Sequence, residues 1–349
     1  MNEQWQDFLQ KNGALFESGV VSGFSTDVFD FALIRQKTIL VDLSHRHLIK
    51  ASGTDTKDFL QGQFCNDVAN VNESHSQLSA YCTPKGRILA SFRLYQAKDD
   101  YFMSMPADVV DATLKRLRMF VMRSQVTLDD VSNEQIQIGF SGPEAAQLLE
   151  QHIGKAPTVA NEVINHKSIC CIRIAAELPR FELFGPIEDI KKLWQKLSTA
   201  SLPVASHYWT WLDIHGGIPA ITAPVVEVFV PQMINLQWID GLSFKKGCYP
   251  GQEIVARTHY LGKLKRRMYL AHVNTLNCPA AGDDLHRLSD PQGQAAGKVL
   301  LSHPAPQGGC DMLVVMQIEA VESDQIIANR DPELSLAFNE LPYSVENAG

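Results

Sequence analysis

The order of predicted strands and helices repeats once along the first two thirds of the chain, and this repeat limits the folds open to it. The first copy begins with an apolar strand that ends at Gly53, and the second with a strand that ends at Gly142. In each copy a helix follows, then three apolar segments, then a helix that starts beside Pro106 or Pro186, then a short strand. Both copies therefore run β-α-β-β-β-α-β, which predicts two split βαβ, ferredoxin-like units, near residues 46–135 and 136–205.

Helical patterns fade beyond Lys265. Short strand candidates follow, divided by Gly, Pro and Asp, and this spacing predicts a small C-terminal β-barrel. The predicted fold class is therefore α+β. We expect residues 1–135 with 205–260 to form the first ferredoxin-like domain, 136–204 the second, and 261–349 the barrel domain.

The composition is that of a soluble globular protein. Of the 349 residues, 45% are hydrophobic and 20% are charged. The N-terminus lacks a basic segment followed by an apolar run, and no apolar stretch is long enough to span a membrane. We therefore expect a cytoplasmic protein without direct membrane contact.

The cysteines favour free thiols over a disulfide framework or a metal site. Their number is odd, seven, and no secretory signal precedes them. No C-x-x-C motif is present, so no zinc site is predicted. Cys170 and Cys171 lie in an apolar run and are predicted to pack in a strand.

Charge is distributed unevenly. The formal net charge is −8, which disfavours broad nucleic-acid binding, yet residues 245–267 carry seven Lys or Arg and one Glu. This local excess of +6 leaves about −14 for the remainder of the chain. The segment is either a solvated face or a binding surface for an anionic ligand or an RNA backbone.

The stretch KKGCYPGQEIVAR, residues 245–257, gathers the densest group of reactive side chains. Cys248 is either a small packed residue or a thiol exposed at a bend. Gly247 and Gly251 allow a tight turn, and the two preceding lysines would favour the thiolate. Glu253 begins a helical pattern, where it would suit the helix dipole or bind a cationic or N–H-rich group.

This stretch resembles the signature of the YgfZ folate-binding proteins, relatives of the aminomethyltransferase (T-protein) of the glycine cleavage system. Supporting segments lie at 52–68, 84–95, 216–219 and 229–236. The matching signature residues are Lys246, Gly247, Cys248, Tyr249, Gly251, Gln252 and Glu253, with Arg257 after them.

The resemblance implies both a fold and a function. It implies two ferredoxin-like domains and a barrel arranged as a ring around a central opening, where tetrahydrofolate or a derivative binds. It further implies support of iron–sulfur enzymes, including those that thiolate tRNA, and a role in tRNA modification. The expected partners are folate and iron–sulfur client enzymes of tRNA thiolation, without strong nucleic-acid binding, and the expected state is a monomer.

Site residues follow from the same resemblance. Trp209 matches one of two tryptophans that the family associates with folate, and Arg46 lies near the position of the other. His215 lies near the position of a glutamate that contacts the pterin in the relatives. With Glu253 and Arg257, these are the implied folate-binding residues. Cys248 is the candidate functional thiol.

One departure concerns catalysis. The T-protein has a catalytic aspartate in a V-I-D-D segment, and the matching stretch here, residues 88–91, ends in Ala90 and Ser91. Neither side chain transfers protons as a carboxylate does. This argues against the alternative function of a folate-dependent one-carbon (aminomethyl) transferase. A third alternative, an RNA-binding module, is disfavoured by the acidic remainder of the chain.

Overall fold

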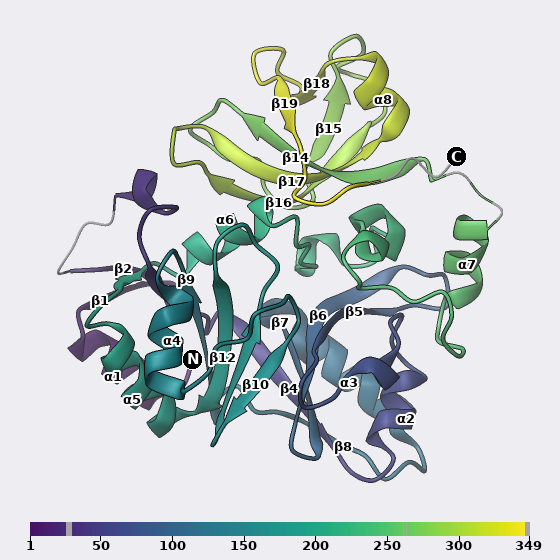
Figure 1. Cartoon of the computed structure of the whole chain (residues 1–349). Helices are drawn as coiled ribbons and strands as arrows, with labels where there is room; N and C mark the ends of the chain where they lie inside the picture. The colour runs from purple at the N-terminus through teal and green to yellow at the C-terminus, as the bar shows by residue number, and fades with distance from the viewer. Residues whose placement is uncertain (26–29, 261, 263, 346–349) are drawn as a thin grey trace. The chain divides into compact units, whose positions relative to one another are not determined.

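The computed structural model describes residues 1–25, 30–260, 262 and 264–345. The chain divides into two compact units (Figure 1). Unit 1 contains Met1–Lys57, Ala69–Gln77 and Arg93–Trp209, and unit 2 contains Asp58–Val68, Leu78–Phe92 and Thr210–Gly349.

The repeated element order is confirmed. The first copy consists of β4 (Arg46–Ser52), α2 (Thr56–Gln61), β5 (Gln77–Cys82), β6 (Ile88–Ala97), β7 (Asp100–Pro106), α3 (Val110–Val121) and β8 (Thr127–Asp130). The second consists of β9 (Gln135–Ser141), α4 (Ala145–Ile153), β10 (Val163–His166), β11 (Ile169–Arg173), β12 (Arg180–Pro186), α5 (Ile187–Leu197) and β13 (Leu202–Val204).

The two sheets differ by one inserted strand. Their orders are β5-β6-β7-β4-β8 and β10-β11-β12-β9-β3-β13. Strand β3 (Ile39–Asp42) comes from the N-terminal segment, pairs antiparallel with β9 and parallel with β13, and so separates two strands of the second copy. The description of the two copies as ferredoxin-like units stays a prediction.

The second sheet buries one face and keeps the other polar. Ile138 and Phe140 of β9 and Leu183 of β12 pack against apolar side chains of α4 and α5. Because successive strand residues point to opposite faces, Gln137, Gly139, Arg180 and Glu182 share the other face, and Glu182 lies directly opposite Gly139. This polar face positions a charged cluster in unit 1.

The N-terminal segment contributes α1 (Glu3–Lys11) and the hairpin β1 (Ala14–Glu17) and β2 (Val20–Phe24) to unit 1. Trp5 and Leu9 of α1 are fully buried beside Trp194 of α5 and extend the same core.

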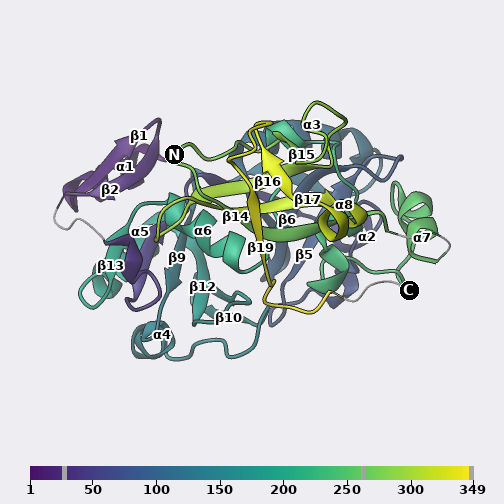
Figure 2. The same cartoon turned by 90° about the horizontal axis from the view of Figure 1, so that it is seen from above.

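Unit 2 is built on a six-stranded antiparallel sheet (Figure 2). In spatial order its strands are β18 (Ile326–Ala328), β15 (Asp284–Arg287), β16 (Gly297–Pro304), β17 (Cys310–Gln317), β14 (Arg266–Val273) and β19 (Leu336–Asn339). Ile327 of β18 bridges to Ser335 just before β19, so the two edge strands approach each other as in a half-barrel. The fold is therefore α+β, as predicted.

Several shorter elements join the strands, and five of them contribute residues to the sites below. They are α6 (His207–His215), the 3₁₀ helices η5 (Pro231–Ile234) and η6 (Leu236–Trp238), α7 (Gln252–Tyr260) and α8 (Ile318–Ser323). Across the residues described, none of the helices has the length and apolar character required to cross a membrane.

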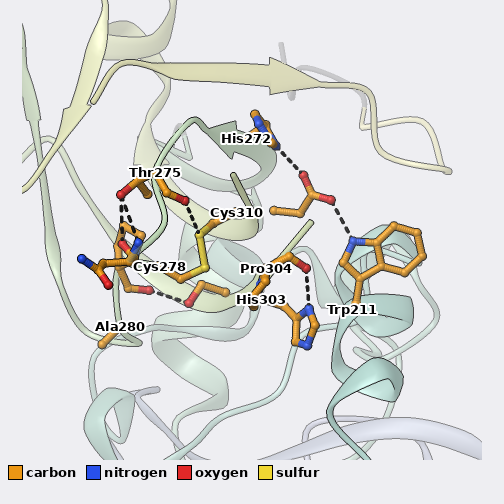
Figure 3. Close-up of a disulfide and its surroundings, with 12 residues drawn as sticks. Trp211, His272, Thr275, Cys278, Ala280, His303, Pro304 and Cys310 are labelled. Atoms are coloured by element: carbon orange, nitrogen blue, oxygen red, sulfur yellow. Dashed lines mark hydrogen bonds and ion pairs between the residues drawn. A yellow bond between two sulfur atoms is a disulfide. The ribbon is translucent and has the colours of Figure 1, made fainter. Parts of the chain in front are cut away.

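The cysteine count argues against a disulfide framework, and the structure has one disulfide among the described residues. Cys278 and Cys310 are joined, with 5.5 Å between their Cα atoms (Figure 3). The cause is tertiary, because Cys310 pairs with Val273 at the end of β14, and the chain leaving β14 brings Cys278 back to it. The predicted packing of Cys170 and Cys171 in a strand, β11, is confirmed.

Candidate functional site

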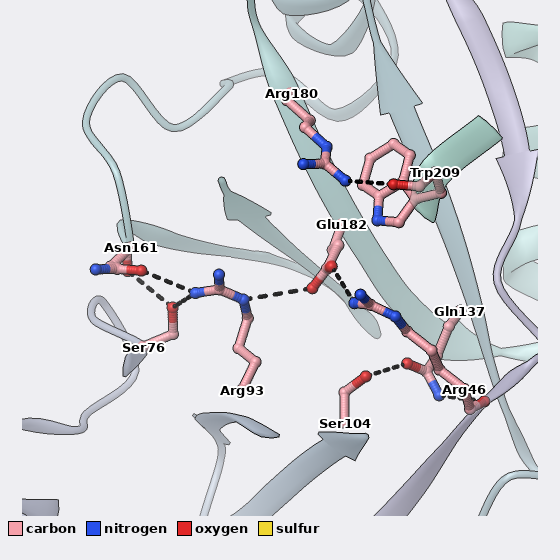
Figure 4. Close-up of polar contacts among 9 residues, drawn as sticks. All are labelled: Arg46, Ser76, Arg93, Ser104, Gln137, Asn161, Arg180, Glu182 and Trp209. Carbon is pink, nitrogen blue, oxygen red and sulfur yellow. Dashed lines mark hydrogen bonds and ion pairs between the residues drawn. The ribbon is translucent and has the colours of Figure 1, made fainter. Parts of the chain in front are cut away.

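Trp209 is fully buried in unit 1, where its ring lies against the backbone of β9 (Figure 4). A Cβ at Gly139 would come within 2.5 Å of the indole ring, so only glycine fits there. The guanidinium carbon of Arg180 lies 4.0 Å from the ring centre, and its Nη2 donates to the Trp209 carbonyl at 3.2 Å. A cation so placed is attracted to the face of the indole.

Glu182 is the acidic centre of the same cluster. Its Oε1 lies 2.7 Å from Nη1 of Arg46, and its Oε2 lies 3.4 Å from Nε of Arg93. Only 3% of the Glu182 side chain and 5% of the Arg93 side chain are exposed. Two guanidinium groups thus pair with one carboxylate. Arg180, which lies on the same strand as Glu182 and against Trp209, adds a third positive charge, so this face carries an excess of positive charge.

Polar neighbours complete this network (Figure 4). Arg93 donates to the side-chain oxygen of Asn161 at 2.8 Å. Ser104 donates to Gln137 at 2.6 Å, and Gln137 donates to the Arg46 carbonyl at 3.1 Å. The Asn161 bond orients the Arg93 guanidinium, and the other two bonds satisfy buried polar groups beside Arg46, where an unpaired group would be destabilising.

Sequence reasoning identified Trp209 and Arg46 but missed their partners Arg93, Arg180 and Glu182. The structure brings Arg46 into an ion pair with Glu182. A signal was present in the strand RFELF, where charged residues alternate with apolar ones although the strand lies mid-sheet. Alternation of this kind indicates a buried polar face when both faces of the sheet are covered.

The signature loop of unit 2 uses its lysine as a structural group. Lys246 is buried, and its Nζ donates to the carbonyls of Gln61 at 2.5 Å and Phe64 at 2.6 Å. The same ammonium lies 5.2 Å from the centre of the Tyr249 ring. Burial lowers the pKa of Lys246 to about 8, against the opposing effect of nearby Cys65 and Asp67.

Cys248 lies between these two buried residues and is exposed. The bend that presents it depends on Gly251, whose φ is +86° and whose added Cβ would lie 2.5 Å from the Thr83 carbonyl oxygen. Gly247 has open space around it and no left-handed backbone, so the predicted need for glycine holds at 251 and not at 247.

Helix α7 closes the loop. The Gln252 amide donates to the carbonyls of Lys246 at 3.3 Å and Gly247 at 3.4 Å. Glu253 lies in the first helical turn, as predicted, and both Glu253 and Arg257 are exposed. The signature thus combines two buried residues, Lys246 and Tyr249, with three exposed residues, Cys248, Glu253 and Arg257.

His215 ends α6 and belongs to a second polar centre in unit 2. Its Nε2 lies 2.8 Å from Oδ2 of Asp311, and Nδ1 of His272 lies 2.8 Å from Oδ1. The Trp211 indole N–H also donates to Asp311 at 2.8 Å (Figure 3). Burial raises the pKa of Asp311, but these three hydrogen bonds outweigh it and lower the pKa to about 2.

Two neutral side chains occupy the positions that the resemblance matched to the T-protein carboxylate. Ala90 and Ser91 are buried on β6, and the Ser91 hydroxyl accepts a hydrogen bond from the backbone N–H of Ile221 at 2.9 Å. Among the described residues, His, Cys, Asp and Glu form no group of three or more that could hold a metal ion.

Comparison with known proteins defines the class first. Residues 24–208 match the model of the GCVT N-terminal domain. The solved structure of glycine cleavage system aminomethyltransferase T from Bartonella henselae superposes with a TM-score of 0.81 at 19% identity, covering 98% of this chain and 97% of that one. The protein is thus of the GCVT class and has the aminomethyltransferase T fold.

Curated relatives then define the family. The tRNA-modifying protein YgfZ of Colwellia psychrerythraea is 33% identical over 88% of this chain and 94% of its own length. The protein of the same name from an Enterobacter species is 31% identical over 90% of this chain and 96% of its own length. The chain belongs to the YgfZ family.

Proposed function

We propose that this chain is a folate-binding accessory protein that supports iron–sulfur enzyme maintenance and tRNA modification. The observation that carries the proposal is the likeness to relatives named tRNA-modifying protein over nearly the whole chain. The GCVT domain, which spans more than half of the chain, supports folate as the ligand.

The charged cluster of unit 1 supports the same ligand. Folates combine an aromatic ring system with a carboxylate tail, and the cluster offers an indole beside an excess of guanidinium groups. The proposed ligand residues are Trp209, Arg46, His215, Glu253 and Arg257. The proposal also includes a ring of domains around a central opening, with the domain boundaries given above. It further includes a cytoplasmic location, a monomeric state and iron–sulfur client enzymes as partners.

The proposal favours binding over group transfer. Because Ala90 and Ser91 cannot act as a carboxylate base, and because the Ser91 hydroxyl is already bonded to Ile221, a one-carbon transferase lacks its acid–base group at this position.

Titration with tetrahydrofolate tests the ligand. We expect saturable heat in calorimetry, and weaker binding as salt is raised, because the ligand is anionic. The loop from Lys263 to Arg267 is proposed to attract the glutamate tail; Lys263 itself lies outside the described residues. Arg46→Gln should weaken binding, whereas Arg35→Gln, at an exposed position, should not. No heat and no tryptophan fluorescence change at millimolar ligand would contradict the proposal.

Cys248→Ala tests the thiol. We expect unchanged stability, because an exposed side chain buries little area, but loss of thiolated tRNA in cells that depend on this protein. Stability is measured by thermal denaturation and thiolation by mass spectrometry of tRNA nucleosides. Cys248→Ser is the matched variant, since it keeps size and polarity and removes only the thiol. An alanine variant that unfolds, or that retains full cellular activity, would show that Cys248 has only a packing role.

A further inference from the structure

Unit 2 contains a pocket whose lining includes none of Trp209, Arg46, His215, Glu253 and Arg257, although it shares residues 265–267 with the loop proposed above to attract the glutamate tail of folate. Its volume is about 780 Å³, within the range of about 300–1,000 Å³ typical of small-molecule sites. The walls come from the segment containing η5 and η6, the end of α7, the start of β14 and the start of α8.

The floor of the pocket is fixed to the sheet. Asn235, between η5 and η6, has a left-handed backbone with φ of 61°. Its side-chain amide donates to the Met268 carbonyl at 3.0 Å and accepts from the Met268 N–H at 3.2 Å. These two bonds hold η5 and η6 against β14, which places Arg266 and Arg267 on an adjoining wall.

Three side chains of the floor have a buried polar atom without a hydrogen-bond partner in the part of the chain that the structure describes. They are Oε1 of Gln232, Oε1 of Gln237 and Nε1 of Trp238. Gln232 is 97% buried, and its Nε2 donates to the Val255 carbonyl at 2.6 Å, which fixes the orientation of its amide. A buried polar atom without a partner destabilises the fold, and here the adjacent cavity is where a partner would enter.

The walls are charged. Lys265, Arg266 and Arg267 follow one another, and Glu319 and Glu322 lie on α8. Arg267 also lies over the Tyr269 ring at 4.7 Å. The pocket therefore offers Lys265 and Arg266 to an anion, beside Arg267, which also donates to the Val345 carbonyl at 3.5 Å. It offers its two carboxylates to groups that donate hydrogen bonds.

We propose that this pocket binds a nucleotide whose base carries an amino group. The amide oxygens of Gln232 and Gln237 and the carboxylates of Glu319 and Glu322 can accept hydrogen bonds from an exocyclic amine. The Trp238 indole N–H can donate a hydrogen bond to the ring nitrogen beside that amine. Adenine and cytosine present this pattern, whereas uracil has no amine. A phosphate is a compact anion that the neighbouring cations Lys265 and Arg266 suit.

The test is calorimetry with AMP, CMP and UMP on the full chain. AMP and CMP are expected to bind about 10-fold more tightly than UMP, because one well-placed hydrogen-bonded pair discriminates by that factor or more. All three affinities should fall as salt is raised. Equal affinity for UMP, or no binding of any nucleotide at millimolar concentration, would overturn the proposal.

Two variants separate the roles of base and phosphate. Gln237→Leu should reduce the preference for AMP over UMP, and Lys265→Ala should weaken all three nucleotides alike. Lys192→Ala, at an exposed position in unit 1, is the matched control and should change nothing. Thermal denaturation verifies that each variant folds.

Folate is the competing ligand. Titration of Gln237→Leu with polyglutamyl tetrahydrofolate distinguishes it, because Gln237 is not among the residues proposed above for folate. If Gln237→Leu abolishes folate binding and leaves nucleotide binding unchanged, the pocket belongs to folate and the nucleotide assignment is wrong.

Discussion

Replacing Glu182 by alanine is expected to lower the free energy of unfolding by about 4 kcal/mol, as measured by urea denaturation. Removing one partner of a buried ion pair leaves the other charge without compensation, which typically destabilises by about 3–5 kcal/mol. Here Arg46 and Arg93 would both lose their carboxylate in a region that is shielded from water.

The matched control is Glu177→Ala. Glu177 also pairs with an arginine, Arg35, at 3.2 Å, but 79% of its side chain and 52% of the arginine's are exposed. Exposed pairs contribute about 0–1 kcal/mol. If Glu182→Ala lowered the free energy of unfolding as little as Glu177→Ala does, this would mean that water reaches the cluster and solvates the arginine charges.

Lys246→Ala is expected to lower the free energy of unfolding by about 3 kcal/mol, because it leaves the buried carbonyls of Gln61 and Phe64 without a donor. Lys245→Ala is the control: Lys245 precedes it in the chain and is exposed, so the expected change is within about 0.5 kcal/mol. Equal effects of the two substitutions would show that the Lys246 ammonium does not hold the loop.

The pH dependence of stability gives a second test of the role of Lys246. Its pKa falls from the ordinary 10.5 to about 8 in the folded chain, so between these values the unfolded chain binds more protons. Stability contributed by this group therefore rises as the pH rises through that window. Lys245→Ala should keep this rise and Lys246→Ala should lose it. Identical slopes for the two variants would contradict the assignment.

The Lys246→Ala and Cys248→Ala experiments separate the signature residues that build the loop from the residue that the loop exposes. Lys246, Tyr249 and Gly251 build the loop, since the first two are buried and the third permits close contact with the Thr83 turn. Cys248 is the exposed group that they present. A sequence motif can thus combine residues that maintain a bend with residues that function at it.

Local patterns were sufficient for the order of elements. Hydrophobic periodicity and the glycines and prolines that end each segment are properties of neighbouring residues, so the β-α-β-β-β-α-β repeat and the C-terminal strands could be predicted from the sequence. The first helical turn of α7 at Glu253 and the strand around Cys170 and Cys171 follow from the same local rules.

Tertiary structure alone decided which distant residues meet. Insertion of β3 between β9 and β13 requires a pairing across about one hundred residues, and the Cys278–Cys310 bond depends on β14 and β17 lying side by side. Glu182 faces Arg46 because two sheets of unit 1 bring β12 and β4 together. Such contacts arise from register and sheet packing, which no local spacing encodes. The sequence by itself therefore determined the elements and the family signature, and the tertiary structure decided the partners of each charged side chain.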